Sequence, residues 1–513
     1  MDPKVLDAAH AAFPSGAASI VLGAVVHEGE CHPEPIVSIP LAMLNRHGLV
    51  AGATGTGKTK TMQLMAEQLS KAGVPVFMAD VKGDVSGMYA AGEPSPRVTQ
   101  RATETGTQWT AEGCPVEFLS LTGAHGAQLR ATVSSFGPLL LAKVLDLNET
   151  QTSVLSLVFK YCDDKRLPLI DFTDLRAVLQ HLTGPGAGEL AEYGGMSKQT
   201  VGVLLREMVE LEQQGAESFF GEPEFDLEDL MHTTGGRGVI SILELKDMQE
   251  KPALFSTFMM WMLARLYNTL PEAGDLDKPK LVFFFDEAHL LFDDSAKAFK
   301  EQVEQVVRLI RSKGIGVYFV TQSPKDIPAD VLGQLGNRVQ HALRAFTPDD
   351  EKGLRAAART FPKTAFYDVQ QTLTSLGIGE ALVTVLSASG APTPPFATRI
   401  APPASRMGPL TDAEMNSALG SSDQVREYAE SIDRESAREL LAARLAPVHD
   451  TGSSIPPAQS PAPAPVPRGR APKEPPSTFQ QILKSPVTRT VAGAVTRGLM
   501  GALFGAPARR RRR

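Results

Sequence analysis

The chain has 513 residues, of which 42% are hydrophobic, 21% charged and 6% aromatic. This composition is typical of a globular protein and excludes a wholly disordered chain or a fibrous repeat. The net charge of −7 argues against a protein that coats nucleic acid through its overall field. Cys31, Cys114 and Cys162 are widely spaced, which excludes a disulfide framework or a zinc ribbon and favours a reducing, cytoplasmic setting.

Neither an export signal nor a membrane span is expected. Residues 1–19 contain early acidic side chains and no continuous apolar run, so we expect no signal peptide. The most hydrophobic stretch, residues 255–270, is shorter than the roughly 20 apolar residues of a membrane span and contains Arg265 and Asn268. We therefore predict a buried core helix there.

Short apolar runs, each with turn residues around it, predict strands. They are His47–Ala51, Val74–Ala79, Val239–Leu245, Leu281–Phe285, Ile315–Val320 and Val383–Leu386. Helical patterns lie between these runs, which predicts βαβ units, an α/β fold and a mainly parallel sheet with ligands at the carboxyl ends of its strands. Before them, Ser19–Val26 and Pro35–Ile39 also have strand patterns.

The rest of the chain divides by composition. Residues 1–46 are predicted to be a short strand region and residues 47–390 the main α/β domain, with a helical insertion at about 134–213. Residues 391–409 form a Pro-rich passage that we expect to separate this domain from a charged, solvent-facing or partner-binding helix in residues 412–445. Residues 446–476 are rich in Pro and Ala and predict a disordered linker, and residues 477–513 form a basic tail.

One motif carries a specific chemistry. The residues Gly52, Ala53, Thr54, Gly55, Thr56, Gly57, Lys58 and Thr59 match G-x-x-x-x-G-K-[ST] at every specified position, after an apolar strand and before a helical pattern. Glycines let the backbone curl so that its N–H groups face phosphates. Lys58 is predicted to reach the β- and γ-phosphates and the Thr59 hydroxyl to ligate Mg²⁺, so ATP and Mg²⁺ are the expected ligands.

Five further residues lie just after an apolar strand or on the helical pattern before one. Asp286 is predicted to hold Mg²⁺ through water, and Glu287 to orient and polarise the attacking water. Gln322 is either a hydrogen-bond partner of the γ-phosphate or a solvent-facing turn residue. Arg308 and Arg311, on the preceding helical pattern, are either solvated or suited to stabilise γ-phosphate charge across a subunit interface.

These motifs resemble the FtsK/HerA branch of the RecA-like P-loop ATPases, and more closely the bacterial HerA-like helicase-domain proteins. The resemblance is carried by residues 39–59, 77–88, 283–292, 304–324 and 332–348, and it spans most of residues 20–390. It implies a five-stranded RecA-like core, a hexameric ring with ATP between subunits, Gln322 as sensor and Arg311 as the trans-acting arginine. It also implies that Arg344 lies near the nucleotide.

The chain also departs from this family. Only about fifty residues precede the phosphate loop, where HerA translocases have a sizeable β-barrel, and no winged-helix module is apparent. Asp80, Lys82 and Asp84 follow the second strand, and we interpret them as polar residues of a surface turn. Residues 477–513 contain eight basic residues and no acidic one, which leaves −15 on the rest of the chain.

Three functions follow as hypotheses. The first is an ATP-driven motor on double-stranded DNA. The second is an ATP-dependent switch or assembly factor that binds protein partners through the helical insertion or the tail. The third is a membrane-bound transport or conjugation ATPase anchored by the basic tail. The tail could instead bind DNA phosphates, pack on a partner subunit or remain a disordered segment.

Overall fold

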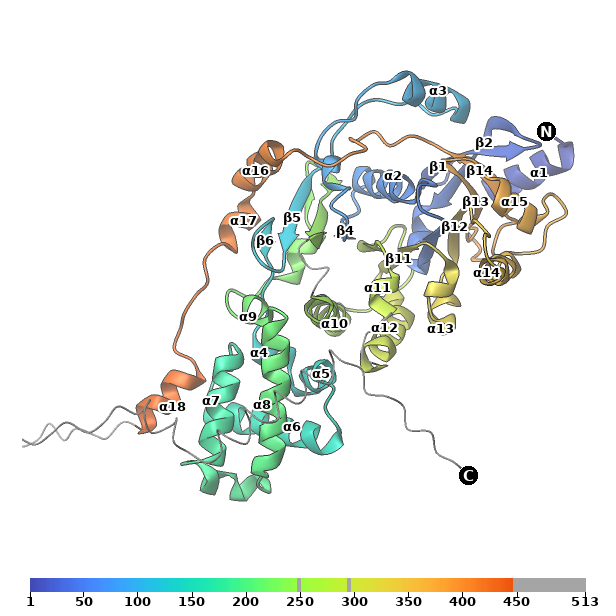
Figure 1. Ribbon diagram of the computed structural model, residues 1–513. Helices are drawn as coiled ribbons and strands as arrows, with labels where there is room; N and C mark the ends of the chain where they lie inside the picture. Colours follow the sequence, from blue (N-terminus) through green and yellow to red (C-terminus); the bar gives the residue numbers. More distant parts are fainter. Residues whose placement is uncertain (247–250, 293–296, 446–513) are drawn as a thin grey trace, which may run out of the picture. The chain divides into compact units, whose positions relative to one another are not determined.

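A computed structural model describes residues 1–246, 251–292 and 297–445 (Figure 1). The predicted linker and basic tail, residues 446–513, lie outside the described residues. The described residues form one compact unit around a 12-stranded sheet. Its strands in spatial order are β2 (Glu30–Pro40), β1 (Ser19–His27), β14 (Phe396–Ile400), β13 (Glu380–Thr384), β12 (Asn337–His341), β3 (Gly48–Ala51), β11 (Ile315–Thr321), β10 (Leu281–Phe285), β4 (Val76–Asp80), β9 (Ile240–Glu244), β5 (Val116–Ser120) and β6 (Ala127–Gln128).

The sheet has a parallel part and an antiparallel part. Neighbouring strands from β12 to β6 pair in parallel, which confirms the predicted α/β fold with a mainly parallel sheet. The other four, β13, β14, β1 and β2, are added to β12 by antiparallel pairing. A separate ribbon, β7 (Thr233–Thr234) and β8 (Arg237–Gly238), lies outside this sheet.

Helices cover both faces of the parallel part. The long helices of the core are α1 (Pro3–Ala12), α2 (Lys58–Lys71), α3 (Pro96–Thr105), α10 (Pro252–Thr269), α12 (Lys297–Ile310) and α14 (Pro348–Arg359). Helices α1 and α2 share one hydrophobic cluster with one face of the sheet, and α10 and α12 share a second cluster with the other face. Strand β10 shows why its sequence is apolar throughout, because Phe283 and Phe285 join one cluster while Val282 and Phe284 join the other.

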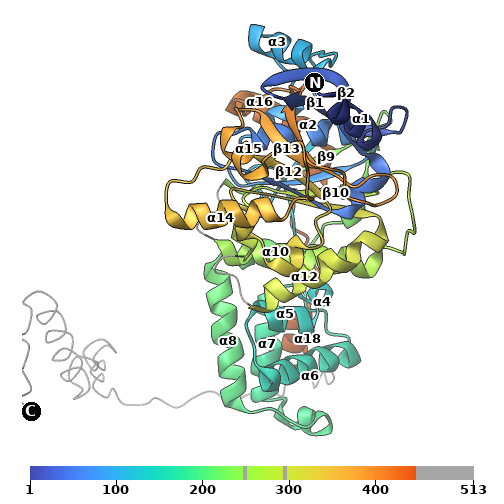
Figure 2. The same cartoon turned by 90° about the vertical axis from the view of Figure 1, so that its right-hand side faces the viewer.

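The predicted helical insertion is present between β6 and β9. Its helices are α4 (Val133–Phe136), α5 (Pro138–Val144), α6 (Glu149–Lys165), α7 (Phe172–Thr183), α8 (Lys198–Gln213) and α9 (Ala216–Phe219). Figure 2 shows α10 and α12 between the sheet and this insertion, and the apolar residues of all three belong to one continuous cluster. The predicted core helix at residues 255–270 is α10, and no helix within the described ranges is long and apolar enough to cross a membrane.

Two predicted boundaries differ from the structure. The region 1–46 is not separate, because β1 and β2 pair into the main sheet. The Pro-rich passage does not end the domain at residue 390, since β14 lies inside it and fills the sheet between β13 and β1. The five-stranded core implied by the resemblance is therefore the centre of a much wider sheet, and the Pro residues flank β14 without interrupting its pairing.

The predicted charged helix over 412–445 is wrong as a single element. The segment forms α16 (Asp412–Ser421), α17 (Asp423–Glu427) and α18 (Ala437–Leu445), because Ser422 caps α17 and interrupts the helix before it. The last helix is also not fully solvent-facing. Ala437 and Leu441 are buried in the cluster that includes the insertion, where α18 packs against α7.

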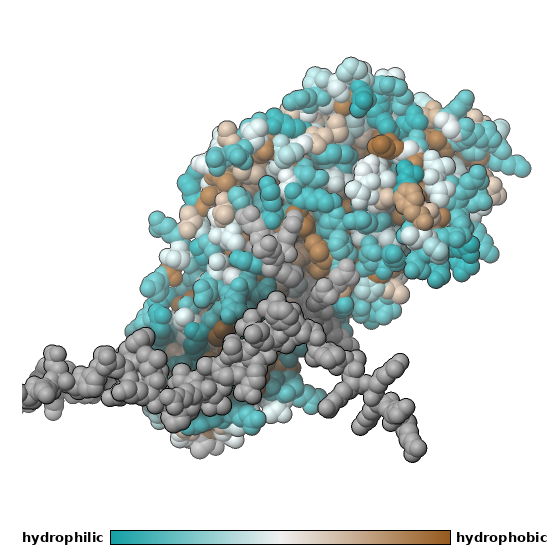
Figure 3. All heavy atoms as spheres, in the orientation of Figure 1, coloured by the Kyte–Doolittle hydropathy of each residue, from teal (hydrophilic) through white to brown (hydrophobic). Residues whose placement is uncertain are grey.

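The surface carries few large apolar side chains. The face shown in Figure 3 is mostly hydrophilic, with hydrophobic residues scattered between polar ones. Among the described residues, the most exposed large hydrophobic side chains are Phe346 (87%), Ile378 (72%) and Leu139 (66%).

Candidate nucleotide site

The phosphate loop joins the end of β3 to the start of α2, as its sequence predicts. Gly52, Gly55 and Gly57 all have positive φ, and Gly57 is the N-cap of α2 with φ of 113°. A Cβ added at Gly52 would lie 2.5 Å from the Cβ of His341. Glycine is therefore required at these turns both by backbone conformation and, at position 52, by space.

Three neighbouring strands tether the loop. The N–H of Gly52 donates to the carbonyl of Thr321 at 3.2 Å, and the N–H of Ala53 donates to that of Ala342 at 2.9 Å. The carbonyl of Thr56 accepts from the N–H of Gly379 at 2.9 Å. Ends of β11 and β12, and the turn before β13, thus hold the loop in the curled form that places its N–H groups around an anion.

Lys58 occupies the centre of this curl. Its Nζ donates to the carbonyls of Gly52 at 2.7 Å and Ala53 at 3.2 Å. Burial lowers the pKa of the Lys58 ammonium, while the nearby carboxylate of Glu287 acts in the opposite direction. A buried cation beside the N-terminus of α2 is the arrangement that binds the phosphates of a nucleotide.

His341 links the helix after the phosphate loop to a neighbouring strand. Its Nδ1 lies 2.9 Å from the carbonyl of Glu380, which can only accept, so Nδ1 donates and Nε2 accepts from the Thr61 hydroxyl at 2.9 Å. Burial lowers the pKa of His341 to about 4. The neutral ring therefore connects α2 to β13 without adding a second positive charge under the phosphate loop.

We expect acid to destabilise the fold through His341. The pKa of His341 is lower in the folded than in the unfolded chain, so protonation favours the unfolded state. The free energy of unfolding therefore decreases as the pH falls from about 6.5 towards 4, by about 2 kcal/mol at pH 5. Denaturant unfolding at pH 7 and pH 5 should therefore show a smaller pH-dependent loss for His341→Gln than for the unchanged chain. His10→Gln, at an exposed position of α1, is the control and should keep the full loss; equal losses in all three proteins would contradict the expectation.

Asp286 and Glu287 lie at the carboxyl end of β10, two strands from β3, so both carboxylates are on the same edge of the sheet as the phosphate loop. Asp286 is 5% exposed, and burial raises its pKa to about 6, opposed by the N–H of Glu287 and the charge of Lys82. Glu287 is also 5% exposed and has φ of 45°, which is rare for a residue other than glycine.

Residues Asp80, Lys82 and Asp84 also belong to this site, so their interpretation as surface-turn polarity is wrong. Asp80 is 1% exposed and accepts hydrogen bonds from the backbone of Lys82, Gly83 and Val85, which fixes the turn after β4. Strand β4 is the direct neighbour of β10, and this pairing brings the turn next to Asp286 and Glu287.

The acidic residues fit a divalent cation. Asp80, Asp84 and Asp286 each offer a carboxylate oxygen, and these oxygens lie within 4.8 Å of one another. The buried atoms Asp84 Oδ1 and Asp286 Oδ2 accept no hydrogen bond from any described residue. Buried carboxylate oxygens without donors are suited to Mg²⁺, which prefers oxygen ligands. Thr59, at the start of α2, lies at the same edge of the sheet.

Lys82 contacts the predicted water-activating carboxylate. Its Nζ forms an ion pair with Glu287 Oε1, and Glu287 Oε2 lies 3.3 Å from Nδ1 of His289. Burial alone would raise the pKa of Glu287, but Lys82, with His289 and Lys58, outweighs it and lowers the pKa. Glu287 is therefore a carboxylate at neutral pH.

Gln322 and Arg344 lie beside the phosphate loop, after the ends of β11 and β12. Both are exposed, and together with Ala53 and Thr54 they line a cleft of about 430 Å³ between the ends of β11 and β12 and helix α14. The exposed ring of Phe346 lines the same cleft. The structure thus brings Gln322 and Arg344 to the side of the phosphate loop, and their contact with a nucleotide stays a prediction.

Arg311 lies away from the other predicted site residues. It begins a short 3₁₀ turn before β11, whereas the phosphate loop and Gln322 follow the carboxyl ends of their strands. A seven-residue strand separates the two edges by about 20 Å. Arg311 is exposed and does not reach the phosphate loop of its own chain, so a role in hydrolysis would require a second subunit.

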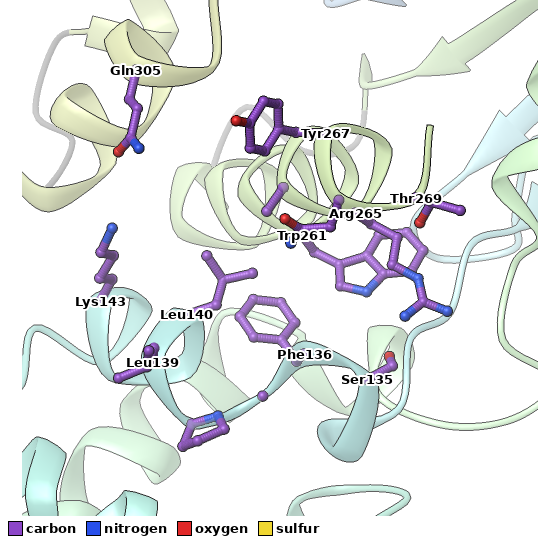
Figure 4. Close-up of a pocket in the computed structure, with 14 residues that line it drawn as sticks. Ser135, Phe136, Leu139, Leu140, Lys143, Trp261, Arg265, Tyr267, Thr269 and Gln305 are labelled. Atoms are coloured by element: carbon purple, nitrogen blue, oxygen red, sulfur yellow. The ribbon is translucent and has the colours of Figure 1, made fainter. Parts of the chain in front are cut away.

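A larger cavity of about 760 Å³ lies where the insertion meets α10 and α12 (Figure 4). Phe136, Leu140 and Trp261 form its apolar wall, with Arg265 and Lys143 at its sides. Trp261 is 1% exposed, and its Nε1 donates to no described residue. The cavity contains none of the phosphate-loop residues, so it is distinct from the nucleotide site.

Sequence reasoning missed the contributions of Lys82, Asp84 and His341. The signal available for the first two was their place just after a buried strand, at the edge where the phosphate loop lies. His341 ends a strand that was not predicted, and no local pattern connects it with the loop 280 residues earlier.

Comparison with known proteins agrees with this geometry. The sequence profile of the family described as Helicase HerA-like C-terminal matches residues 27–513. The DNA double-strand break repair helicase HerA of Sulfolobus acidocaldarius is 21% identical over 363 residues, which are 68% of this chain and 64% of that protein. A probable helicase of Methanocaldococcus jannaschii is 31% identical over 115 residues, 22% of this chain and 21% of that protein.

Among solved structures, the bacterial conjugative coupling protein TrwB has a TM-score of 0.49 and 14% identity, covering 79% of this chain and 94% of that one. VirB4 of Thermoanaerobacter pseudethanolicus has a TM-score of 0.47 and 14% identity, and the match covers 78% of this chain and 99% of that one. The matched part of the chain spans from a fifth to just under two thirds of the length of the two curated relatives. From the family match over nearly the whole chain, together with its phosphate loop and acidic edge, the protein belongs to the HerA-like helicase C-terminal family of P-loop ATPases.

Proposed function

We propose that the protein is a Mg²⁺-dependent ATP hydrolase that acts as a motor on double-stranded DNA. The observation that supports hydrolysis is the convergence of the phosphate loop and the Asp286–Glu287 pair at one edge of the parallel sheet. Phosphoryl transfer depends on positioning and on stabilisation of charge, and these groups supply both.

Each side chain has a defined task in this proposal. The loop N–H groups and Lys58 bind the β- and γ-phosphates of ATP, and Glu287 holds and polarises the attacking water. Thr59 and Asp286, assisted by Asp84, would hold Mg²⁺, which supplies charge neutralisation on the phosphate oxygens. Gln322, at the mouth of the cleft beside Thr54, would contact the γ-phosphate or the water.

We further propose that the active form is a homo-oligomer, most simply the hexameric ring that the resemblance implies. The support is the position of Arg311, on the opposite edge of the sheet from the phosphate loop of its own chain. In a head-to-tail ring one edge of each subunit faces the other edge of the next, so Arg311 of one chain would approach the γ-phosphate of its neighbour.

Arg311→Ala should reduce ATP turnover by about 10³-fold and leave ATP affinity unchanged, because the guanidinium would act only on transition-state charge. Mixing Arg311→Ala with Glu287→Gln subunits should restore part of the activity, since some interfaces then contain both intact groups. Arg308→Ala, at an exposed position of α12, is the matched control. Failure of the mixture to recover any turnover would contradict a role in trans.

The DNA part of the proposal is tested by steady-state ATP hydrolysis with and without linear duplex DNA, at low and moderate salt. The curated relative from Sulfolobus acidocaldarius is named a DNA double-strand break repair helicase, which supports DNA as the substrate class. If the protein is a motor, duplex DNA should increase its rate of ATP hydrolysis at both salt concentrations. Glu287-dependent hydrolysis that is indifferent to DNA would reject the motor.

The second candidate function is an ATP-dependent switch that binds a protein partner without translocation. The observation that favours it is the cavity in Figure 4, which lies where the helical insertion joins α10 and α12. DNA-independent turnover, together with hydrolysis that responds to a protein partner of the insertion, would support this function.

We also propose a cytoplasmic setting and a DNA-binding rather than membrane-binding role for residues 477–513. The support is the three unpaired cysteines, of which Cys114 and Cys162 are buried, and the eight basic residues of the tail. Deleting residues 477–513 should weaken DNA stimulation and leave cell-fractionation behaviour unchanged. Release from a membrane fraction on deletion would favour the membrane alternative.

A further inference from the structure

The contact between Lys82 and Glu287 has a consequence for how hydrolysis is started. Lys82 Nζ forms an ion pair with Glu287 Oε1, and the Lys82 side chain is 45% exposed whereas that of Glu287 is 7% exposed. The lysine therefore reaches from the surface down to a buried carboxylate. A carboxylate oxygen that accepts from an ammonium has less capacity left to accept from water.

The backbone of Lys82 is held in place, while its side chain can rotate. Asp80 Oδ1 accepts from the backbone N–H of Lys82 at 3.2 Å and of Gly83 at 2.8 Å, and Oδ2 accepts from Val85 at 3.0 Å. These bonds hold the turn after β4 in place. The four-carbon stem of Lys82 can still rotate, so its ammonium can change partners without a change in the backbone.

Glu287 is held in a similar way. Its backbone has φ of 45°, in the left-handed region that costs most residues of the order of 1–2 kcal/mol. The N–H of Ala288 donates to the carbonyl of Val320 at 2.9 Å, which fixes the chain just after it. The position of the carboxylate is therefore determined by the backbone, and what can change is which group it contacts.

A bound triphosphate would compete for the same lysine. Lys82 lies close enough to Lys58 for its charge to lower the pKa of the Lys58 ammonium, after the larger effect of burial. The γ-phosphate carries more negative charge than one carboxylate, and a diphosphate lacks it altogether. The ammonium of Lys82 is thus shared between two acceptors, one of which is present only when ATP is bound.

We propose that Lys82 is a latch on Glu287 that opens when a γ-phosphate enters the phosphate loop. Without a triphosphate, Lys82 occupies Oε1 of Glu287. With one, Lys82 moves to the γ-phosphate, and Glu287 becomes free to hold the attacking water. Lys82 is then a positioning residue that makes the site respond to ATP and not to ADP. This inference rests on the proposed ATPase function.

The test is a double-mutant cycle read by binding, so that turnover does not enter. The affinities of a non-hydrolysable ATP analogue and of ADP, each with Mg²⁺, are measured for the unchanged chain, Lys82→Met, Glu287→Gln and the double variant. In the Glu287→Gln background, where the latch is weakened, Lys82→Met should weaken analogue binding about tenfold, the effect of one charge-assisted hydrogen bond. In the chain that keeps Glu287, Lys82→Met should weaken analogue binding about threefold or less. There the contact of Lys82 with the γ-phosphate is offset by the broken ion pair with Glu287, so its removal costs less affinity.

ADP affinity should stay within about twofold in all four proteins, and Lys82→Arg should retain analogue binding in the Glu287→Gln background. Lys71→Met is the control, because Lys71 is a similarly exposed lysine that pairs with Glu112 at the far end of α2, and it should change neither affinity. Equal losses in both backgrounds, or equal losses for analogue and ADP, would overturn the latch. An unchanged chain that binds neither nucleotide would instead overturn the proposed function.

Folding of the variants is checked by their melting temperatures. Lys82→Met leaves Glu287 buried without its partner, which can destabilise the single variant. The Glu287→Gln background removes that charge, so the comparison of Glu287→Gln with the double variant remains valid even if the single variant unfolds.

Discussion

Glu287→Gln is expected to bind ATP and to lose about 10³-fold of its turnover. The amide is close in size to the carboxylate, so the site keeps its shape, but it cannot accept a proton from the attacking water or polarise it as a charge would. The residue is buried at the end of β10, next to the carboxylates of Asp80, Asp84 and Asp286.

Single-turnover hydrolysis and equilibrium binding measured on the same preparation separate these two effects. Glu272→Gln is the matched control, because Glu272 is an exposed glutamate that pairs with Lys313 at 2.9 Å on the opposite edge of the sheet. It should hydrolyse ATP at the rate of the unchanged chain. Full activity in Glu287→Gln would show that another group activates the water.

Lys58→Ala should weaken ATP binding by at least about 100-fold. The ammonium lies inside the curled loop, 2.7 Å from the carbonyl of Gly52, and its removal takes away the only charge-assisted contacts predicted for the β- and γ-phosphates from this loop. A 100-fold loss corresponds to about 2.7 kcal/mol, within the range of one or two such bonds.

Isothermal titration with a non-hydrolysable analogue measures this loss. The melting temperature should change little, because glycine conformations and the tethers to β11 and β12 set the shape of the loop. Lys71→Ala, at the other end of α2, is the control and should bind as the unchanged chain does. Tight binding by Lys58→Ala would mean that the phosphates lie elsewhere.

The sequence alone identified the parts of this protein whose cause is local. Gly52–Thr59 could be recognised because its conformation is set by glycines and by the strand and helix on either side. The strands that are buried on both faces, such as β10 and β11, could be recognised because nearly all of their residues are apolar. The three long insertion helices, α6, α7 and α8, could be recognised because one side of each is buried and the other is not.

Tertiary structure alone decided the features that depend on partners far apart in the chain. Strand β14 lies in a Pro-rich passage whose composition indicates a linker, and it is a strand because β1 and β13 supply hydrogen bonds on both sides. Ala437 and Leu441 of α18 are buried because the insertion supplies an apolar surface for them. Composition does not reveal such partners.

The same division holds within the site. Asp286 and Glu287 were identifiable because they directly follow an apolar strand, but the chain gives no local sign that Lys82, 205 residues earlier, contacts Glu287. That contact exists because β4 and β10 are neighbours in the sheet, and strand order is a property of the whole fold. Local sequence therefore determined which groups this protein has for binding and hydrolysing a nucleotide. Only the pairing of strands decided which of those groups touch, because the energy of each contact depends on a partner that local pattern does not specify.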